Sequence, residues 1–347
     1  MARTVLVCGV QVPLVSGGAE LLGRSLVNEL VRRGYDAEQV NLPFKSYPKD
    51  EILSHAAAWR LLDLSESNGR PIDLVIGTKF PSYWARHPHK VAWVMHQYRA
   101  AYELCGTAFS DFDHVERDVA LRSALVELDT RMLRECRHIY TLSRNTANRL
   151  RRYNAIDAEP LYHPSHLSDR LFTAPAEAYV LSVARLEPVK RVTMAIESMV
   201  HVDPGVRLVH VGEGSQRKEC RALVERLGLG DRVRFAGTIG DEALVGLYAR
   251  ALAVVYAPFD EDYGYVTLEA FLARKPVITA SDSGGTLEFV EDGVNGAVCE
   301  PRPEALAAAV NAYAADRRRA AEHGGAGYER ARLVTWDGVV ERLTGVP

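Results

Sequence analysis

The sequence has few cysteines, and none of them is arranged in a pair. Its 347 residues include five cysteines, and these are Cys8, Cys105, Cys136, Cys220 and Cys299. No C-x-x-C pair occurs, and no group of cysteines and histidines has the spacing of a zinc site. A disulfide framework and a structural zinc centre are therefore excluded as the basis of the fold, and reduced thiols in a cytoplasmic protein are expected.

Long apolar runs and a strong excess of one charge are also missing. No stretch approaches the roughly 20 apolar residues that a membrane helix needs, so any membrane contact is expected to be peripheral. The formal net charge is -3, which supplies no positive field to attract nucleic acid. Hydrophobic residues make up 47% and charged residues 25% of the chain. That balance is typical of a globular enzyme, and the length fits two domains.

Short apolar runs alternate with amphipathic helical stretches along the whole chain. This alternation predicts an α/β fold with parallel sheets covered by helices on both faces. Helices are expected at residues 19–33, 115–136 and 241–250 among others. The expected strands are Val5–Cys8, Glu38–Asn41, Leu74–Gly77, Val91–His96, Ile139–Leu142, Leu161–His163, Val180–Val183, Arg207–Val211, Val233–Phe235, Ala253–Ala257, Val277–Thr279 and Ala297–Cys299.

A polar, turn-rich segment near residues 164–178 divides the chain into two halves of the same architecture. We interpret it as a linker between a Rossmann-like domain of residues 1–168 and a second one of residues 169–329. A final helix is expected in the tail, residues 330–347, with Thr335 as its N-cap. The sequence pattern leaves open which domain that helix packs on.

Glycines mark the first candidate site. Gly17 and Gly18 belong to the stretch Ser16-Gly17-Gly18-Ala19-Glu20, between the first expected strand and a helical pattern. Glycine lets the backbone approach a phosphate closely, and a helix N-terminus offers free N–H groups. Gly-Gly is common at turns between a strand and a helix, so a plain turn is the simpler explanation of this stretch on its own. The stretch is not G-x-G-x-x-G, which argues against a dinucleotide-dependent dehydrogenase.

Polar side chains follow three other expected strands. Arg185 and Lys190 follow Val180–Val183, and a planar guanidinium beside an ammonium suits a pyrophosphate. His96 ends another strand, where parallel sheets bind ligands. The stretch Ser283-Gly284-Gly285-Thr286-Leu287-Glu288 follows a third. Each also has a structural alternative: solvated charges, a structural histidine and a tight turn.

The strongest candidate is the stretch from Pro258 to Ala270. It places Glu261 on a loop after a buried strand and Glu269 eight residues later, inside a helix that starts near Gly264. Two carboxylates beside the free N–H groups of a helix start can hold two sets of sugar or ribose hydroxyls. A D-x-D pattern, Asp260-Glu261-Asp262, could also hold Mg²⁺ or Mn²⁺. Because Arg185 and Lys190 can neutralise the same diphosphate, no obligatory metal is expected.

Together these stretches resemble the GT-B glycosyltransferases of family 4, and among them the bacterial mannosyltransferase-like members that build surface polysaccharides. Two positions depart from the family pattern: Ala184 and Arg191 stand where the family usually has glycine. Its E-G-F-G also becomes Glu261-Asp262-Tyr263-Gly264. The stretches that carry the resemblance are Gly17-Gly18-Ala19-Glu20, Ser182-Val183-x-Arg185-Leu186 with Lys190, Val211-Gly212-Glu213-Gly214, Glu261 with Glu269, Ser283-Gly284-Gly285 with Glu288, and Trp336, with a weaker contribution from Thr78-Lys79-Phe80-Pro81 and His96-Gln97-Tyr98-Arg99.

The resemblance implies a fold of two facing Rossmann-like domains with a cleft between them, acceptor in the first and donor in the second, with the tail helix crossing back to the first. Arg185 and Lys190 would bind the donor diphosphate, Glu261 the sugar hydroxyls and Glu269 the ribose. The implied catalytic residues are Arg185, Lys190, Glu261 and His96, and the implied donor-binding residues are Gly17, Gly18, Thr238, Tyr263, Gly264, Tyr265, Val266 and Glu269.

The implied activity is a metal-independent hexosyl transfer that retains the anomeric configuration. The co-substrate would be GDP-mannose or a UDP-sugar, no cofactor is expected, and the acceptor would be a glycan, a lipid-linked or a small-molecule hydroxyl. The alternatives are a nucleotide-sugar 2-epimerase and a non-catalytic nucleotide-sugar-binding partner subunit. Seven arginines between Arg131 and Arg152, with Glu135 as the one acid among them, suggest either contact with the inner membrane surface or a solvated helix face. The oligomeric state stays open.

Overall fold

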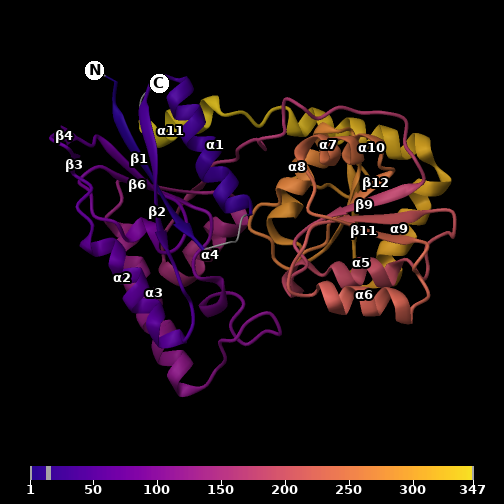
Figure 1. The fold of residues 1–347 in the computed structure, drawn as a ribbon, viewed down its shortest axis with the longest axis horizontal. Coiled ribbons are helices and arrows are strands. Elements are labelled where there is room, and N and C mark those ends of the chain that lie inside the picture. The colour runs from indigo at the N-terminus through magenta and orange to yellow at the C-terminus, as the bar shows by residue number, and fades with distance from the viewer. Residues whose placement is uncertain (1, 13–16, 346–347) are drawn as a thin grey trace. The chain divides into compact units, whose positions relative to one another are not determined.

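The computed structural model describes residues 2–12 and 17–345 (Figure 1). It divides into two units: Met1–His163 with Thr335–Pro347, and Pro164–Val334. Each unit is built on a six-stranded sheet and has a hydrophobic core of its own. The expected α/β class with two Rossmann-like domains is confirmed.

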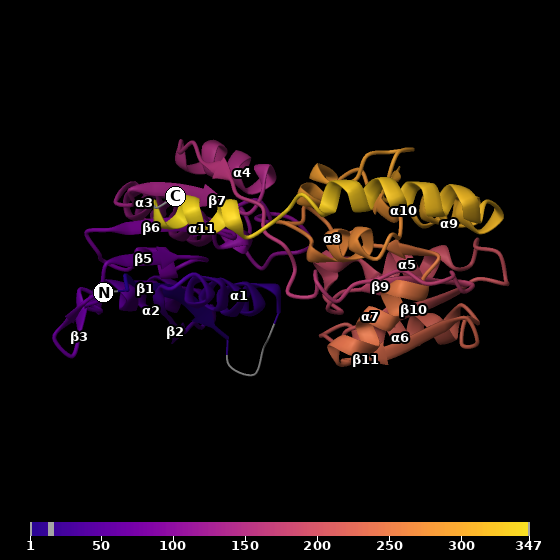
Figure 2. The same ribbon diagram turned by 90° about the horizontal axis from the view of Figure 1, so that it is seen from above.

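The first unit has its strands in the order β2-β1-β5-β6-β7-β8, and all neighbours are parallel. The interior strand β1 has five Val, Leu or Cys residues among its eight and is buried on both faces, as expected of a parallel strand covered by helices. Figure 2 shows α11, the tail helix, beside β7 in this unit. The elements are β1 Thr4–Gln11, α1 Gly18–Arg32, β2 Asp36–Pro43, η1 Lys49–Glu51, α2 Ile52–Leu61, β3 Glu66–Ser67, β4 Arg70–Pro71, β5 Leu74–Gly77, η2 Ser82–Trp84, β6 Lys90–Val94, η3 Arg99–Ala101, α3 Glu116–Arg134, β7 His138–Thr141, α4 Arg144–Asn154, β8 Glu159–Pro160 and α11 Asp337–Thr344.

The second unit has the strand order β11-β10-β9-β12-β13-β14, again with parallel neighbours. In Figure 1 the helices α5 and α6 lie on one side of its strands, and α7, α8 and α10 lie on the other. The elements are β9 Tyr179–Val183, η4 Pro188–Lys190, α5 Val192–Ser198, β10 Arg207–Val211, α6 Arg217–Arg226, β11 Val233–Gly237, α7 Asp241–Arg250, β12 Ala253–Val255, α8 Tyr265–Leu272, β13 Val277–Ala280, η5 Gly284–Glu288, β14 Gly296–Cys299, α9 Pro303–Ala315 and α10 Arg317–Ala331.

The segment near residues 164–178 is not a loose linker. It belongs to the second unit, and the units divide after His163 rather than after residue 168. Leu167 is fully buried, and the backbone N–H groups of Ala174 and Glu177 donate to carbonyls at the end of α7. The polar side chains of this segment suggested a linker, but its apolar residue and its backbone are used in packing.

Two local expectations in the first unit are wrong. The last strand is Glu159–Pro160 rather than Leu161–His163. The N–H of Leu161 still donates to the Thr141 carbonyl of β7 at 2.8 Å, but the Leu161 carbonyl accepts from the Trp93 indole at 3.3 Å. Thr335 is not the N-cap of the tail helix, since that position is Trp336. The Trp336 ring packs on His163, with 5.6 Å between ring centroids, so aromatic contact rather than a hydroxyl fixes the helix start.

Candidate active site

The carboxyl ends of β9, β12 and β13 bring three loops of the second unit together. Parallel sheets bind ligands at this edge because every strand delivers its loop there. The N–H of Phe259 donates to the carbonyl of Val189 at 2.8 Å, and the N–H of Asp260 donates to Asp282 at 2.9 Å. The N–H of Gly285 donates to the Glu261 carbonyl at 2.7 Å. The motifs after these strands therefore form one connected surface.

Lys190 and Glu261 form an ion pair on this surface. Their side chains are 16% and 12% exposed, so the charges are held close to solvent but largely shielded from it. The Lys190 ammonium lies 3.5 Å from the Tyr256 hydroxyl. Burial, and then the charge of Glu261, raise the pKa of Tyr256 well above its usual value, so its hydroxyl keeps its proton. The arrangement is a cation and a carboxylate supported by a neutral phenol.

The carboxylate of Glu269 is buried and is held by two hydroxyl groups. Its Oε1 accepts from Ser165 at 2.6 Å, and its Oε2 accepts from Tyr248 at 2.8 Å. Burial raises the pKa of the Glu269 carboxyl, while these two hydrogen bonds act in the opposite direction. Each oxygen accepts one bond from these partners, and a carboxylate oxygen can accept a second. Glu269 is therefore a fixed acceptor rather than a mobile one.

Arg185 projects from the loop after β9. The residue is exposed, and no hydrogen bond or ion pair of its guanidinium occurs within residues 2–12 and 17–345. The glycines of the loop after β10 press against the same segment: a Cβ on Gly212 would lie 2.0 Å from the Ala184 carbonyl oxygen, and one on Gly214 would lie 2.5 Å from that of Leu186. The sequence V-G-E-G thus shapes the loop that presents Arg185.

Gly264 lets α8 begin where it does. Its φ of 82° is left-handed, and it stands directly before the first helical residue, Tyr265. The adjacent Tyr263 is 3% exposed and packs edge-on against Tyr265 and Phe289, with centroids 5.8 and 5.6 Å away. The N–H of Thr267 donates to the Gly264 carbonyl at 3.0 Å. N–H groups in the first turn of a helix, such as that of Val266, can in general bind ligand oxygens. Thr238 directly follows β11 and is exposed.

The expected residues of the first unit meet at the carboxyl edge of its own sheet. Gly17 precedes α1, and its N–H donates to Glu20 Oε2 at 2.8 Å, while Lys79 donates to Glu20 Oε1 at 2.9 Å. Gly18 is the first residue of α1. His96 follows β6, and its Nδ1 lies 2.7 Å from the carbonyl oxygen of Gln97. The Gly17 N–H, which the resemblance assigns to a phosphate, is thus already bonded to a carboxylate. Ser16, of the same motif, lies outside the described residues.

Comparison with known proteins places the second unit in a family. Residues 168–330 match the model of the family described as glycosyl transferases group 1. This part of the chain is a group 1 glycosyltransferase domain. The match covers β9 to α10 and so includes Arg185, Lys190, Glu261 and Glu269.

Individual proteins are similar to this chain in sequence or in fold, and the fold neighbours confirm the expected GT-B class. The human alpha-1,3/1,6-mannosyltransferase ALG2 is 30% identical over 169 residues, which are 44% of this chain and 40% of that protein. The chain thus matches about two-fifths of that relative's length. The sucrose-phosphate synthase of Thermosynechococcus elongatus has a TM-score of 0.76 at 20% identity, covering 99% of this chain and 98% of that one. HepE of Anabaena, solved in complex with UDP-glucose, has a TM-score of 0.72 at 19% identity and covers 99% of both chains.

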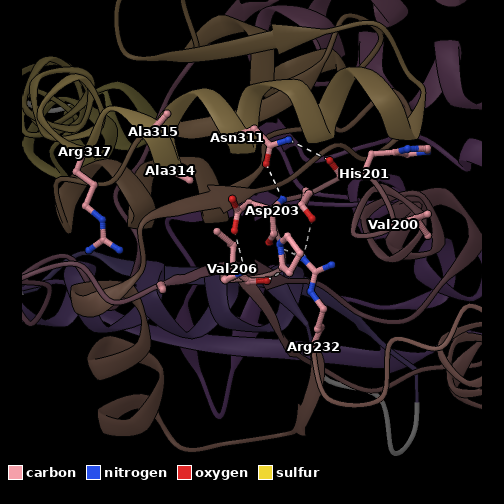
Figure 3. A pocket seen from close by; sticks show the side chains of 13 residues that line it. Val200, His201, Asp203, Val206, Arg232, Asn311, Ala314, Ala315 and Arg317 are labelled. Carbon is pink, nitrogen blue, oxygen red and sulfur yellow. Dashed lines mark hydrogen bonds between the residues drawn. The ribbon is translucent and has the colours of Figure 1, made fainter.

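A hollow of about 700 Å³ lies at the opposite edge of the glycosyltransferase domain (Figure 3). Three of its lining residues, Ala178, Val206 and Arg232, directly precede β9, β10 and β11. The guanidinium of Arg232 donates to backbone carbonyls, including that of Val202 at 3.0 Å. Asn311 accepts from the N–H of Asp203 at 2.9 Å. The hollow is at the amino ends of the strands, where these side chains brace loops, and it is separate from the candidate active site.

Two other kinds of feature are absent from the described residues. In that part of the chain, no group of three or more His, Cys, Asp or Glu side chains is placed to hold a metal ion. No helix there is both long and apolar enough to cross a membrane. Independence from metal stays a prediction.

The sequence did not indicate the residues that support the two glutamates. Ser165 lay in a segment interpreted as a linker, and Tyr248 lay in the expected helix of residues 241–250 with no sign of its partner. Tyr256 is the last residue but one of the expected strand Ala253–Ala257. Such contacts join positions far apart in the chain, and single-chain patterns carry no signal for them. Arg191 was noted only as a departure from the family's glycine.

Proposed function

We propose that the chain transfers a hexose from a nucleoside-diphosphate sugar to a hydroxyl acceptor, with retention of configuration and without a metal ion. The observation that carries the proposal is the group formed by Lys190, Glu261 and Glu269 with an exposed Arg185, inside a group 1 glycosyltransferase domain. These residues supply two cations for a diphosphate and two carboxylates for hydroxyls.

The donor diphosphate would bind Arg185 and Lys190. As the bond to the sugar breaks, negative charge grows on the phosphate oxygen that leaves, and fixed cations stabilise that charge without reorganising. Lys190 is held in place by Glu261 before the donor arrives. The first-turn N–H groups of α8 would add hydrogen bonds to the same ligand.

The two glutamates would hold hydroxyls. Glu261 accepts from Lys190 and would also accept from the donor sugar, so it connects the sugar to the cation at the phosphate. Glu269, fixed by Ser165 and Tyr248, would accept from the ribose. His96, at the carboxyl edge of the first unit's sheet, would contact the sugar near the acceptor, and the backbone at Thr238 would contact the base.

Retention would follow from attack on the face that the phosphate leaves. In this mechanism the departing phosphate oxygen takes the proton of the acceptor hydroxyl, and the acceptor oxygen bonds to the anomeric carbon as the sugar–phosphate bond breaks. Nuclear magnetic resonance of the product decides the stereochemistry: the proposal requires the same anomeric configuration as in the donor, and an inverted product rejects it.

A thermal-shift series identifies the donor. A ligand that binds only the folded protein raises its unfolding temperature. At a ligand concentration of one hundred times the Kd, the free energy of unfolding increases by about 2.7 kcal/mol. GDP-mannose, UDP-glucose and ADP-glucose are compared at equal concentration. One of them is expected to raise the midpoint, and no shift with any nucleotide sugar contradicts the proposed donor class.

Peripheral contact with anionic lipid at the inner membrane surface is a further part of the proposal. Of the seven arginines in question, Arg149 is 5% exposed and paired with Glu103, so it does not belong to the surface. Arg131 and Arg151 are exposed but face Glu127 and Asp157. The proposed basic surface consists of the exposed Arg134, Arg137 and Arg152. Co-sedimentation with anionic vesicles at low salt supports contact, and its absence at low salt rejects it.

A further inference from the structure

Arg191 adopts a backbone conformation that suits glycine. Its φ is 49° and its ψ is 40°, where η4 ends and α5 begins, directly after Lys190. A residue with a Cβ is strained in this left-handed region, and glycine is not. Such strain persists where the surroundings fix the residue by other contacts.

The side chain of Arg191 supplies those contacts. Its Nη1 and Nη2 donate to the two carboxylate oxygens of Asp282 at 2.8 and 2.6 Å. Its Nε donates to the Ala257 carbonyl at 2.9 Å, and Nη2 also donates to the Pro258 carbonyl at 2.8 Å. The side chain is 14% exposed. A two-pronged guanidinium–carboxylate pair with two further carbonyl bonds fixes both position and orientation, which a lysine cannot do.

These four bonds connect the three loops of the candidate active site. Arg191 belongs to the loop after β9, Ala257 and Pro258 begin the loop that carries Glu261, and Asp282 follows β13. The carbonyl of Asp282 also accepts from the N–H of Asp260. The backbone of Asp260 is left-handed too, with a φ of 44°. The Arg191–Asp282 pair is therefore bonded to the start of the loop that carries Glu261, and Arg191 directly follows Lys190 in sequence.

We propose that Arg191 and Asp282 are positioning residues that hold Lys190 and Glu261 in the geometry needed for transfer. This rests on the proposed function, in which Lys190 and Glu261 act on the donor. The side chain of Arg191 donates to protein oxygens on two other loops, so it acts through its neighbour in sequence, Lys190, and through the loop of Glu261. The arginine takes the place of glycine because its side chain provides the fixation.

Arg191→Gly is the variant that tests this role. Glycine relieves the strain of the left-handed backbone, so the variant is expected to fold, with a thermal midpoint that is lower by only a few degrees because the hydrogen bonds of the side chain are lost. Transfer is expected to lose about tenfold or more in kcat, since small misplacements of catalytic groups have effects of this size, while KM for the donor changes less. Guanidinium ion at a sub-denaturing concentration is expected to restore part of the lost kcat.

Two comparisons complete the test. Asp282→Asn is expected to lower kcat in the same way, and the double variant is expected to be no slower than Arg191→Gly, because both changes break one unit. Arg302→Gly removes an exposed pair with Glu300, whose side chains are 60% and 70% exposed, and is expected to keep wild-type kcat. A wild-type kcat in Arg191→Gly, or losses that multiply in the double variant, overturns the proposal.

The wild-type protein separates this proposal from the one on which it depends. If the wild type transfers sugar and the variants match it, only the positioning role fails. If the wild type neither binds a nucleotide sugar nor transfers it, the proposed function fails first.

Discussion

Lys190 and Glu261 show how a charged pair can be both a support and a site. Each charge is largely shielded, so each depends on the other for its electrostatic stability. Arg185 differs because it is exposed and has no such dependence within the described residues. Removing each cation should therefore have different consequences.

Lys190→Ala is expected to lower both activity and stability. Transition-state stabilisation of about 2.7–4 kcal/mol would be lost if the lysine acts as an oxyanion-hole donor does, a decrease of roughly 10²–10³ in kcat. Glu261 would also remain without its ammonium, which lowers the free energy of unfolding. Steady-state kinetics and urea unfolding measure the two effects. Wild-type kcat in a folded Lys190→Ala would contradict a role in catalysis.

Among the elements, helix α8 depends on the glycine that directly precedes it, Gly264. A Cβ at Gly264 would lie 3.0 Å from Thr286 Oγ1 and 3.1 Å from Tyr256 Cε1, in a residue whose φ is already 82°. Gly293 has a similar φ of 71°, and nothing lies within 4 Å of its Cβ position. An alanine at either position is strained in its backbone, but only an alanine at position 264 also crowds its neighbours. Comparing the two variants therefore distinguishes the effect of backbone strain from the effect of crowding.

Gly264→Ala is expected to lose nucleotide-sugar binding, because the helix start and Tyr256 must shift. Gly293→Ala should lower the free energy of unfolding by only the cost of the left-handed backbone, about 1–2 kcal/mol. It should bind the donor as the wild type does. Urea unfolding and calorimetric titration measure stability and binding. Equal binding by both variants would contradict a role for the start of α8 in the donor site.

Helix α3 contains a buried carboxyl group in the core of the first unit. Asp129 is 0% exposed and accepts from Trp84 Nε1 at 2.6 Å, from the Tyr102 hydroxyl at 2.8 Å and from the Tyr83 hydroxyl at 3.1 Å. Burial raises the pKa of Asp129 to about 7, although the three hydrogen bonds act to lower it. The folded protein therefore holds this proton at pH values where the unfolded chain has released it.

The sign of the pH dependence follows from that difference. Between about pH 4 and 7 the folded state binds more protons at Asp129, so its contribution to the unfolding free energy falls as pH rises, by at most about 1.4 kcal/mol per pH unit. Above 7 the contribution is constant. Asp129→Asn should remove this slope, and Asp157→Asn, at an 81% exposed side chain, should keep it. Urea unfolding at several pH values measures both, and an unchanged slope in Asp129→Asn contradicts the assignment.

For the whole molecule, the sequence predicted the architecture better than the connections within it. Eleven of the twelve expected strands overlap observed ones, because buried parallel strands are continuous apolar runs with a strong signal. The same patterns placed Lys190 and Glu261 on loops that follow strands, and Glu269 inside the helix after the second of these loops. They did not indicate Ser165, Tyr248 or Arg191, whose hydrogen bonds depend on how distant loops pack. The polar segment after His163 was wrongly predicted to be a linker for the same reason, because composition does not show that the segment packs against the second unit.

Calorimetric titration of GDP and UDP into wild-type protein and Arg185→Ala tests the central claim most directly. Arg185 is exposed, so its removal should leave the fold intact, and Arg302→Ala provides an exposed arginine outside the candidate site. The account predicts that the wild type and Arg302→Ala bind one of the two diphosphates with the same Kd, and that Arg185→Ala binds it at least about tenfold more weakly, as expected for loss of a charge-assisted contact. Equal Kd values for Arg185→Ala and the wild type would contradict a diphosphate site at the carboxyl edge of this sheet.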